Sequence, residues 1–168
     1  IPDDIYNSSN FKKSEEYSKK DIEQGELVRD IWATRFDKLV AHTKVITILD
    51  RYFVKNLVED IKENKKTSLE TFLENLSGSS SRKISLHFYS KWDGNASERN
   101  SVEKYLSKSL YETTFFNDSI ASVSISGCPD RFFSKNAHER FFKLDNHVLA
   151  IGNGMELFRT TQVKVTHF

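Results

Sequence analysis

The amino-acid sequence predicts an α/β fold in which a mixed β-sheet is flanked by helices on both faces. Short runs rich in β-branched residues, such as KVITILD (44–50) and KISLHFYS (83–90), have the composition of strands. Segments with apolar residues at helical spacing lie between these runs. The alternation of strand and helix along the chain is typical of α/β proteins.

The composition fits one soluble domain with a core rich in phenylalanine. The 168 residues are 38% hydrophobic and 29% charged, and thirteen of them are Phe. The formal net charge of +1 excludes a globally basic nucleic-acid-binding protein, so any phosphate ligand must be held by a local patch. No apolar run reaches the roughly 18–20 residues of a membrane span. The single cysteine, Cys128, excludes a disulfide within the chain and favours a reducing, cytoplasmic location.

The pattern along the chain divides it into two parts. Residues 1–23 are polar and mix charges, which predicts a linker or a loosely ordered segment. Residues 24–168 are assigned to a single domain. The chain begins Ile-Pro-Asp-Asp and its one methionine is Met155. We therefore interpret it as a domain excised from a longer protein, which has further domains or protein partners.

The first half of the domain is predicted to contain two strands and three helices. ELVRDIW (26–32) is predicted as a strand and ATRFDKLVAHT (33–43) as a helix. KVITILD follows as a buried strand, and a helix is expected over 52–62 with its apolar residues on one face. SLETFLENL is a further helix that begins with its predicted N-cap, Ser68.

The second half is predicted to contain a strand, a helix, another strand and a hairpin. KISLHFYS is separated by a loop over 91–100 from an amphipathic helix over 101–116. SIASVSIS (119–126) is a strand that ends at Gly127. HERFFKLD and HVLAIGN form a hairpin about Asp145-Asn146, and VKVTHF (163–168) is a short closing strand.

Four residues of the predicted hairpin have the spacing of a known phosphodiesterase motif. His138, Arg140, Asp145 and Gly152 follow the pattern H-x-R-x4-D-x6-G. This resembles the signature H-x-K-x4-D-x6-G-[ST] of the phospholipase D superfamily, with Arg140 in place of the lysine and Asn153 in place of the hydroxyl residue. The resemblance implies a single phospholipase-D-like repeat. It also implies a site at which one histidine attacks phosphorus while a second histidine protonates the leaving oxygen.

A closer resemblance lies within that superfamily. AHERFFKLDNHVLAIGNGMELF (137–158) resembles the C-terminal domain of microtubule-interacting-and-trafficking (MIT) domain proteins, which carry H-[DE]-R and then I-G-x-G-[LM]-[DE]-x-F. ITILDRYF (46–53) resembles the buried strand and turn of that family, with Arg51 in place of a proline. The resemblance covers roughly residues 26–168. It implies a domain that has lost catalysis and binds membrane phospholipid.

These residues predict a site for an anionic phosphate group. A guanidinium at 140 binds phosphate bidentately but does not reproduce the compact ammonium of the family motif, which favours binding over turnover. Asp145 is predicted to orient the imidazole of His138 or of a dimer mate, so His138 and Asp145 are catalytic only in an active dimer. No zinc-ligand spacing and no phosphate loop occur, so neither a metal nor a cofactor is predicted. The predicted ligand-binding residues are His138, Arg140, Gly152, Asn153, Arg131 and Lys135.

Three functions follow from this site. The first is a non-catalytic module that binds an anionic phospholipid head group or a nucleic-acid backbone. The second is a dimeric, metal-independent phosphodiesterase or nuclease, because each motif supplies one histidine and only a homodimer brings two together. The third is a protein-interaction scaffold with a vestigial pocket. Phe132 and Phe133 are either core residues or a pair that enters a membrane or stacks on bases. The first function implies a cytoplasmic protein peripheral to a membrane.

Overall fold

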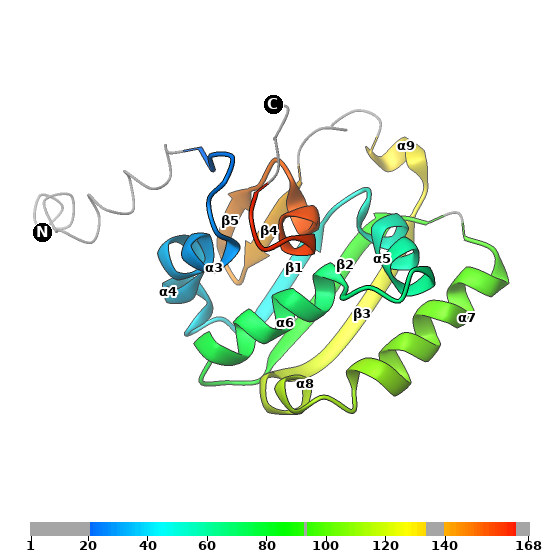
Figure 1. Ribbon diagram of the computed structural model, residues 1–168, viewed down its shortest axis with the longest axis horizontal. Coiled ribbons are helices and arrows are strands. Elements are labelled where there is room, and N and C mark those ends of the chain that lie inside the picture. Colours follow the sequence, from blue (N-terminus) through cyan, green and yellow to red (C-terminus); the bar gives the residue numbers. More distant parts are fainter. Residues whose placement is uncertain (1–20, 93, 134–139, 164–168) are drawn as a thin grey trace, which may run out of the picture.

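The computed structural model describes residues 21–92, 94–133 and 140–163. It has a five-stranded mixed β-sheet beside a layer of helices, which confirms the predicted α/β class (Figure 1). Within the described residues, no helix is long and apolar enough to cross a membrane.

The strands lie in the order β3-β2-β1-β4-β5. The first three are mutually parallel, whereas β4 runs antiparallel to β1 and forms a hairpin with β5. The predicted strands at 44–50, 83–90 and 119–126 and the predicted hairpin are therefore confirmed. The bounds are β1 Val45–Leu49, β2 Ile84–Lys91, β3 Ile120–Cys128, β4 Phe141–Leu144 and β5 His147–Ala150.

The helical segments fall mostly between the strands, as α/β topology requires. The predicted helix over 52–62 is confirmed as α5. Two short segments, η1 and η2, are π-helical, and η3 is a 3-10 helix. The bounds are α3 Val28–Ile31, η1 Trp32–Phe36, α4 Asp37–Val40, α5 Phe53–Lys62, α6 Ser68–Ser79, α7 Ala96–Lys104, η2 Tyr105–Leu110, α8 Thr114–Ser119, α9 Asp130–Phe133 and η3 Gly154–Arg159.

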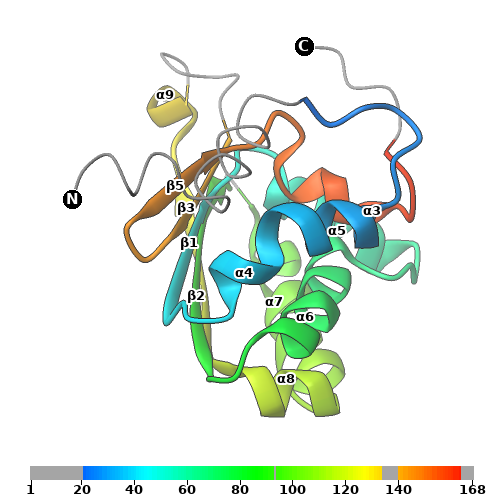
Figure 2. The same ribbon diagram turned by 90° about the vertical axis from the view of Figure 1, so that its left-hand side faces the viewer.

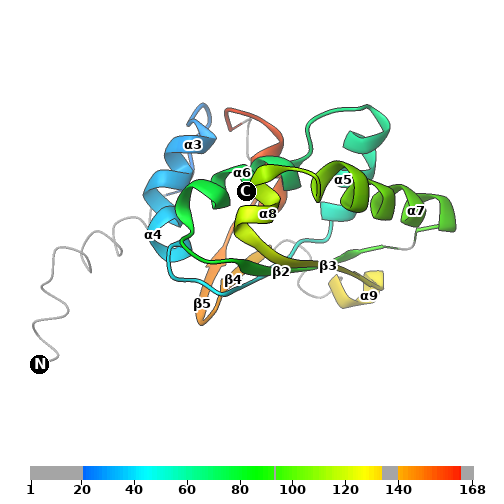
Figure 3. The same ribbon diagram turned by 90° about the horizontal axis from the view of Figure 1, so that it is seen from below.

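The two faces of the sheet differ in how they are covered. Figures 2 and 3 show the helices from α3 to α8 on one face, and of the described helices only the one-turn α9 lies on the other side. The side chains alternate accordingly. Ile46 and Ile48 of β1 are buried under the helices, whereas Ser122, Ser124 and Ser126 of β3 are exposed. Helices were predicted on both faces, but one face carries nearly all of the described helices. The hydrophobic core lies between that face and its helices.

Aromatic side chains form the centre of that core, as the composition predicted. Trp32 stacks on Phe36, and Phe72 meets Phe158 edge to face with ring centroids 5.1 Å apart. Phe142 of β4 contacts the same cluster. These contacts join α3–η1, α6, β4 and η3, so the C-terminal hairpin and the N-terminal helices share one core.

The prediction of a strand over 26–32 is wrong, because this segment is helical. Val28, Ile31, Trp32 and Phe36 are buried, and their spacing is that of one helix face. The segment was predicted as a strand, but the helical conformation buries the Trp32 and Phe36 rings in the core and is therefore favoured. Only Leu27 retains a strand-like contact, an isolated bridge to Gln162.

Two further boundaries differ from prediction. The expected loop over 91–100 ends at Asn95, whose side chain accepts the Glu98 N–H and so starts α7 at Ala96. The single helix expected over 101–116 is divided into α7, η2 and α8. The closing strand expected over 163–168 lies outside the described residues, except for Val163.

Helix α6 is capped by Thr67 and not by the predicted Ser68. The Thr67 hydroxyl accepts the Glu70 N–H at 3.1 Å and lies 2.7 Å from the Tyr105 hydroxyl. That environment is buried, which raises the pKa of Tyr105 to about 12. The hydroxyl of Ser68 is also buried, but it has no hydrogen-bond partner within the described residues.

We therefore expect Thr67→Ala to destabilise the protein clearly more than Ser68→Ala. Thr67→Ala removes the N-cap and a partner of Tyr105, which should lower the free energy of unfolding by about 1–2 kcal/mol. Ser68→Ala removes a hydroxyl without a partner and should change it by less than about 0.5 kcal/mol. Urea unfolding followed by circular dichroism measures both. An equal loss in the two variants would contradict the assigned cap.

Candidate functional site

The carboxyl ends of the three parallel strands bring basic residues to one edge of the sheet. Arg51 follows β1, Lys91 ends β2, and Arg131 lies in α9 directly after β3. Arg140 precedes β4, and because β4 is antiparallel to β1 it reaches the same edge. We call Arg51, Lys91, Arg131 and Arg140 the basic rim. Strand direction reverses between β1 and β4, and open α/β sheets bind ligands at such an edge.

The buried carboxylate of Asp50 organises the middle of this edge. Asp50 is 2% exposed and accepts the N–H groups of Tyr52 at 2.9 Å and Met155 at 2.8 Å. The Arg140 guanidinium lies 3.6 Å away. Burial raises the pKa of Asp50 above its ordinary value, while the two N–H donors and Arg140 oppose that rise. The carboxylate thus holds the β1–α5 turn and the start of η3 together.

Arg140 is a predicted phosphate ligand, but its guanidinium already has several partners within the protein. It pairs with Asp50, donates a hydrogen bond to the Gly152 carbonyl and lies 5.2 Å from the centre of the Tyr52 ring. Its side chain is 17% exposed. The structure therefore brings Arg140 and Gly152 together and gives Arg140 a supporting role within the protein. Its role as a phosphate ligand stays a prediction.

The second glycine of the Gly-x-Gly sequence is required by this arrangement. Gly154 has φ +52°, a left-handed conformation that side chains rarely adopt. A Cβ atom there would lie 2.3 Å from the Asp50 carboxylate and 2.5 Å from Cδ of Arg140. Gly154 thus permits the Asp50–Arg140 contact. Asn153, a predicted ligand-binding residue, lies beside it at the start of η3 without a side-chain capping hydrogen bond.

The structure places Asp145 at the far end of β4 from Arg140. The two residues flank the four-residue strand, so their Cα atoms are about 16 Å apart. The Asp145 carboxylate accepts the N–H groups of Lys44 at 3.1 Å and Val45 at 3.0 Å. It therefore anchors the hairpin turn to the start of β1. His138 and Lys135, the remaining predicted site residues, lie outside the described residues.

The rim also contains two cations that the sequence analysis did not predict as ligands, Arg51 and Lys91. The guanidinium of Arg51 lies 2.6 Å from the Asp130 carboxylate, and the Lys91 ammonium lies 3.5 Å from the same oxygen. Arg51 is also 5.6 Å from the centre of the Tyr52 ring. One carboxylate is thus shared by two cations. Their position directly after or at the end of parallel strands was a signal that could have identified them.

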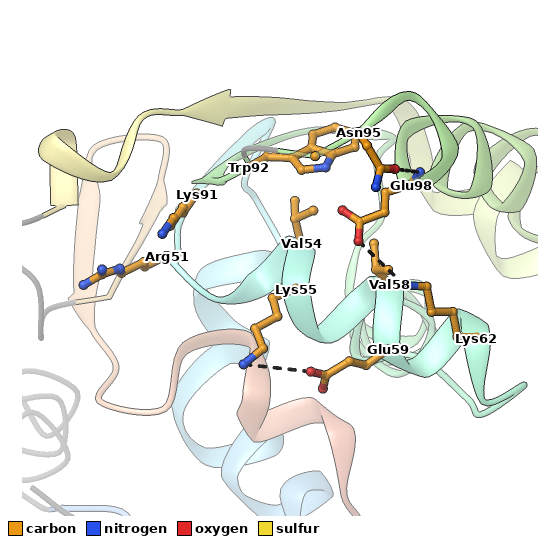
Figure 4. Close-up of a pocket in the computed structure, with 11 residues that line it drawn as sticks. Arg51, Val54, Lys55, Val58, Glu59, Lys62, Lys91, Trp92, Asn95 and Glu98 are labelled. Carbon is orange, nitrogen blue, oxygen red and sulfur yellow. Dashed lines mark hydrogen bonds and ion pairs between the residues drawn. The ribbon is translucent and has the colours of Figure 1, made fainter.

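A cavity of about 500 Å³ opens beside the rim between α5 and the segment that joins β2 to α7 (Figure 4). Arg51 and Lys91 line it together with the apolar side chains of Val54, Val58 and Trp92. The remaining wall is polar. Lys55 and Glu59 form one ion pair there and Lys62 and Glu98 another. The rim and the cavity therefore share two residues. Within the described residues, no group of His, Cys, Asp and Glu side chains could hold a metal ion.

Comparisons of this chain with protein-family models, with curated proteins and with solved structures find no match.

The Asp50–Arg140 pair predicts a stability change that depends on pH. A raised pKa means that the contribution of Asp50 to stability is fully present below about pH 3.8 and is lost as the pH rises through the folded-state value. Removing Arg140 raises that pKa further. Arg140→Met should therefore lower the free energy of unfolding by about 1–3 kcal/mol at about pH 7, and by much less at about pH 3.5.

Urea unfolding at both pH values measures this difference. The control is Arg140→Met in an Asp50→Asn background, where the pH dependence of its cost should vanish because residue 50 no longer ionises. An equal cost at both pH values in the Asp50 background would show that Arg140 does not stabilise the charged carboxylate.

Proposed function

We propose that this chain is a phospholipase-D-like domain that binds an anionic phosphate group without cleaving it. The observation that carries the proposal is the basic rim, which gathers Arg51, Lys91, Arg131 and Arg140 at the carboxyl edge of a parallel sheet. A chain with a net charge of +1 has no general excess of cations. The rim is therefore the local patch that such a chain needs in order to hold phosphate.

Arg51 and Lys91 are the primary ligands in this proposal. Arginine presents a planar fork of donors to phosphate oxygens, and lysine adds a compact charge. In the structure both cations face Asp130, which is 48% exposed and occupies the position of an internal anion. An incoming phosphate displaces Asp130 from Arg51. Because a partly exposed ion pair contributes little stability, that exchange costs little free energy.

In this proposal Arg140 mainly stabilises the rim through its contact with Asp50. It neutralises Asp50, fixes the turn that carries Arg51, and contributes its exposed part to the ligand. Gly152, whose carbonyl accepts a hydrogen bond from Arg140, and Asn153 lie in the connection between β5 and η3. The predicted roles of His138 and Lys135 are carried forward as part of the proposal, since both are close to the rim in sequence.

The ligand that we favour is a phospholipid head group at a membrane surface. Phe132 of α9 is 57% exposed and adjacent in sequence to Arg131 of the rim. An exposed aromatic residue beside basic residues is the pairing that peripheral proteins use at anionic bilayers. The resemblance to the MIT-protein C-terminal domain supports the same choice. A nucleic-acid backbone is the alternative ligand, and its binding would fall steeply with salt concentration.

Charge removal at the rim tests the proposal. The double variant Arg51→Gln, Lys91→Gln should weaken binding to phosphatidylserine-containing vesicles by about 30-fold, since each basic residue near such a surface contributes about 1 kcal/mol. The matched control is Arg82→Gln, Lys83→Gln, which removes the same charge from exposed residues at the amino end of β2. Vesicle co-sedimentation measures both. Equal weakening would mean that net charge and not the rim governs binding.

The neighbouring phenylalanines provide a second test. Phe132→Ala should reduce vesicle binding about tenfold and leave the thermal unfolding temperature unchanged, because the ring is exposed. Phe133 is 6% exposed, so Phe133→Ala should lower the free energy of unfolding by about 3 kcal/mol. Unfolding of Phe132→Ala would place that ring in the core and remove it from the membrane contact.

The absence of turnover is tested separately. Bis(p-nitrophenyl) phosphate should not be hydrolysed in the presence of EDTA. Hydrolysis that is lost in His138→Ala, from a chain that sediments as a dimer, would establish the phosphodiesterase alternative and contradict the non-catalytic proposal.

A further inference from the structure

The sheet has one face that its helices leave largely uncovered. Helices α3 to α8 lie on one side of the sheet, and of the described helices only the one-turn α9 lies on the other (Figures 2 and 3). We call the side that carries α9 the open face. Sheets of parallel strands, such as β1, β2 and β3, usually have both faces covered. The open face is therefore a candidate surface for a partner.

An apolar row crosses this face. The register places one residue from each of four neighbouring strands side by side, namely Ala150, Phe141, Leu49 and Tyr89. Their side chains point to the open face, because side chains alternate along a strand and the preceding residues Ile48 and Phe88 are buried under the helices. Ala150 and Tyr89 are exposed, and Leu49 and Phe141 are half-buried. The row is thus a continuous apolar strip at the surface.

The two most exposed large apolar side chains of the described residues lie on the same side. Val148 of β5 is 59% exposed, and its register partner Lys143 is two residues from Phe141 on the same face. Phe132 of α9 is 57% exposed. Contiguous apolar surface with polar groups at its border is typical of a protein or membrane contact.

Positive charges predominate on the open face. The five described strands contain no Asp or Glu, whereas each of the helices α3 to α8 contains at least one. Lys143 is exposed on this face, and Lys91 follows Tyr89 by two residues and so shares its side of the sheet. Asp130 of α9 supplies a carboxylate, which is paired with both Arg51 and Lys91. The open face is therefore complementary to an anionic surface.

These features favour an anionic bilayer over other occupants of the face. A second copy packed face to face would bring the cations Lys143 and Lys91 toward their own counterparts, with no strand carboxylate to pair with them. Single-stranded nucleic acid requires aromatic rings for successive bases, and Tyr89 is the one exposed aromatic residue of the row. A bilayer with anionic lipids accepts both the cations and the projecting side chains of Val148 and Phe132.

We infer that the open face, together with α9, is the surface that lies against an anionic lipid bilayer. The inference rests on the proposed function and adds to it the orientation of the domain on the membrane. A head-group phosphate at the basic rim binds at the edge of this surface, because Lys91 belongs to both. Val148 and Phe132 enter the interface, while helices α5 to α7 face away from the bilayer.

Loss of an apolar group and loss of a cation test the face at a distance from the rim. Val148→Ser and Lys143→Gln should each weaken binding to vesicles of phosphatidylcholine and phosphatidylserine about fivefold, measured by co-sedimentation. Lys108→Gln is the control for the charge, because Lys108 is exposed in η2, between α7 and α8 on the side of the helices. It should weaken binding by less than about twofold.

One substitution made on both sides of the sheet separates the surface from the net charge. Ser126→Glu places a carboxylate opposite Tyr89 on the open face and should weaken vesicle binding about fivefold. Ser107→Glu in η2 changes the net charge equally and should leave binding within about twofold of the wild type. Both serines are exposed, so thermal unfolding should be nearly unchanged in both variants.

The outcomes distinguish the inference from the proposed function. If Arg51→Gln, Lys91→Gln weakens vesicle binding but the open-face variants bind like their controls, the inference is overturned and the rim remains the site. Failure of the wild-type chain to bind any anionic vesicle would overturn the proposed membrane ligand itself, and the inference with it.

Two further measurements identify a different occupant. A wild-type dimer in sedimentation equilibrium that Ser126→Glu converts to a monomer, without a loss of vesicle binding, would assign the open face to a second copy. Oligonucleotide binding that Lys143→Gln and Ser126→Glu weaken, in a chain that binds no vesicle, would assign it to nucleic acid. Either result would overturn the inference.

Discussion

The buried carboxylate of Asp50 ties together three segments that are far apart in the chain. It directly follows the central strand β1, accepts the Met155 N–H at the start of η3, and pairs with Arg140 before β4. A carboxylate that is 2% exposed is tolerated only with such partners, because burial without them costs several kcal/mol. The Tyr52 N–H completes the set and fixes the β1–α5 turn. Gly154 is needed for the same reason, since a side chain there would meet the carboxylate.

The proposed ligand site depends on that arrangement. The turn fixed by Asp50 carries Arg51, so the position of the proposed primary phosphate ligand follows from the buried contact. Lys91 reaches Asp130 from the next strand, and the parallel register of β1 and β2 places the two strand ends side by side. The cavity is formed where α5 leaves the same turn. Changes at Asp50 or Arg140 should therefore be examined for stability before they are interpreted as changes in binding.

The motif residues divide between the two ends of one hairpin. Arg140, Gly152 and Gly154 meet at the carboxyl edge, whereas Asp145 holds the opposite turn through the Lys44 and Val45 N–H groups. The spacing of the motif thus has a structural explanation that is independent of chemistry. It sets the length of β4 and the point at which the chain returns to Asp50. A sequence pattern of this kind can mark a fold even where it does not mark an active site.

The sequence by itself determined the class of fold, most of the strands and the C-terminal hairpin. The β-branched runs and the Asp145-Asn146 turn are local signals, and local preference and burial agree at those positions. Only the tertiary structure decided that residues 28–36 are helical, because the aromatic core that holds Trp32 and Phe36 is built from distant segments. The same holds for the site. Sequence spacing predicted a relation between Arg140 and Gly152, which are in contact, but the Arg140–Asp50 pair joins residues ninety positions apart. Such a contact depends on the pairing of β1 with β4, which no local pattern specifies.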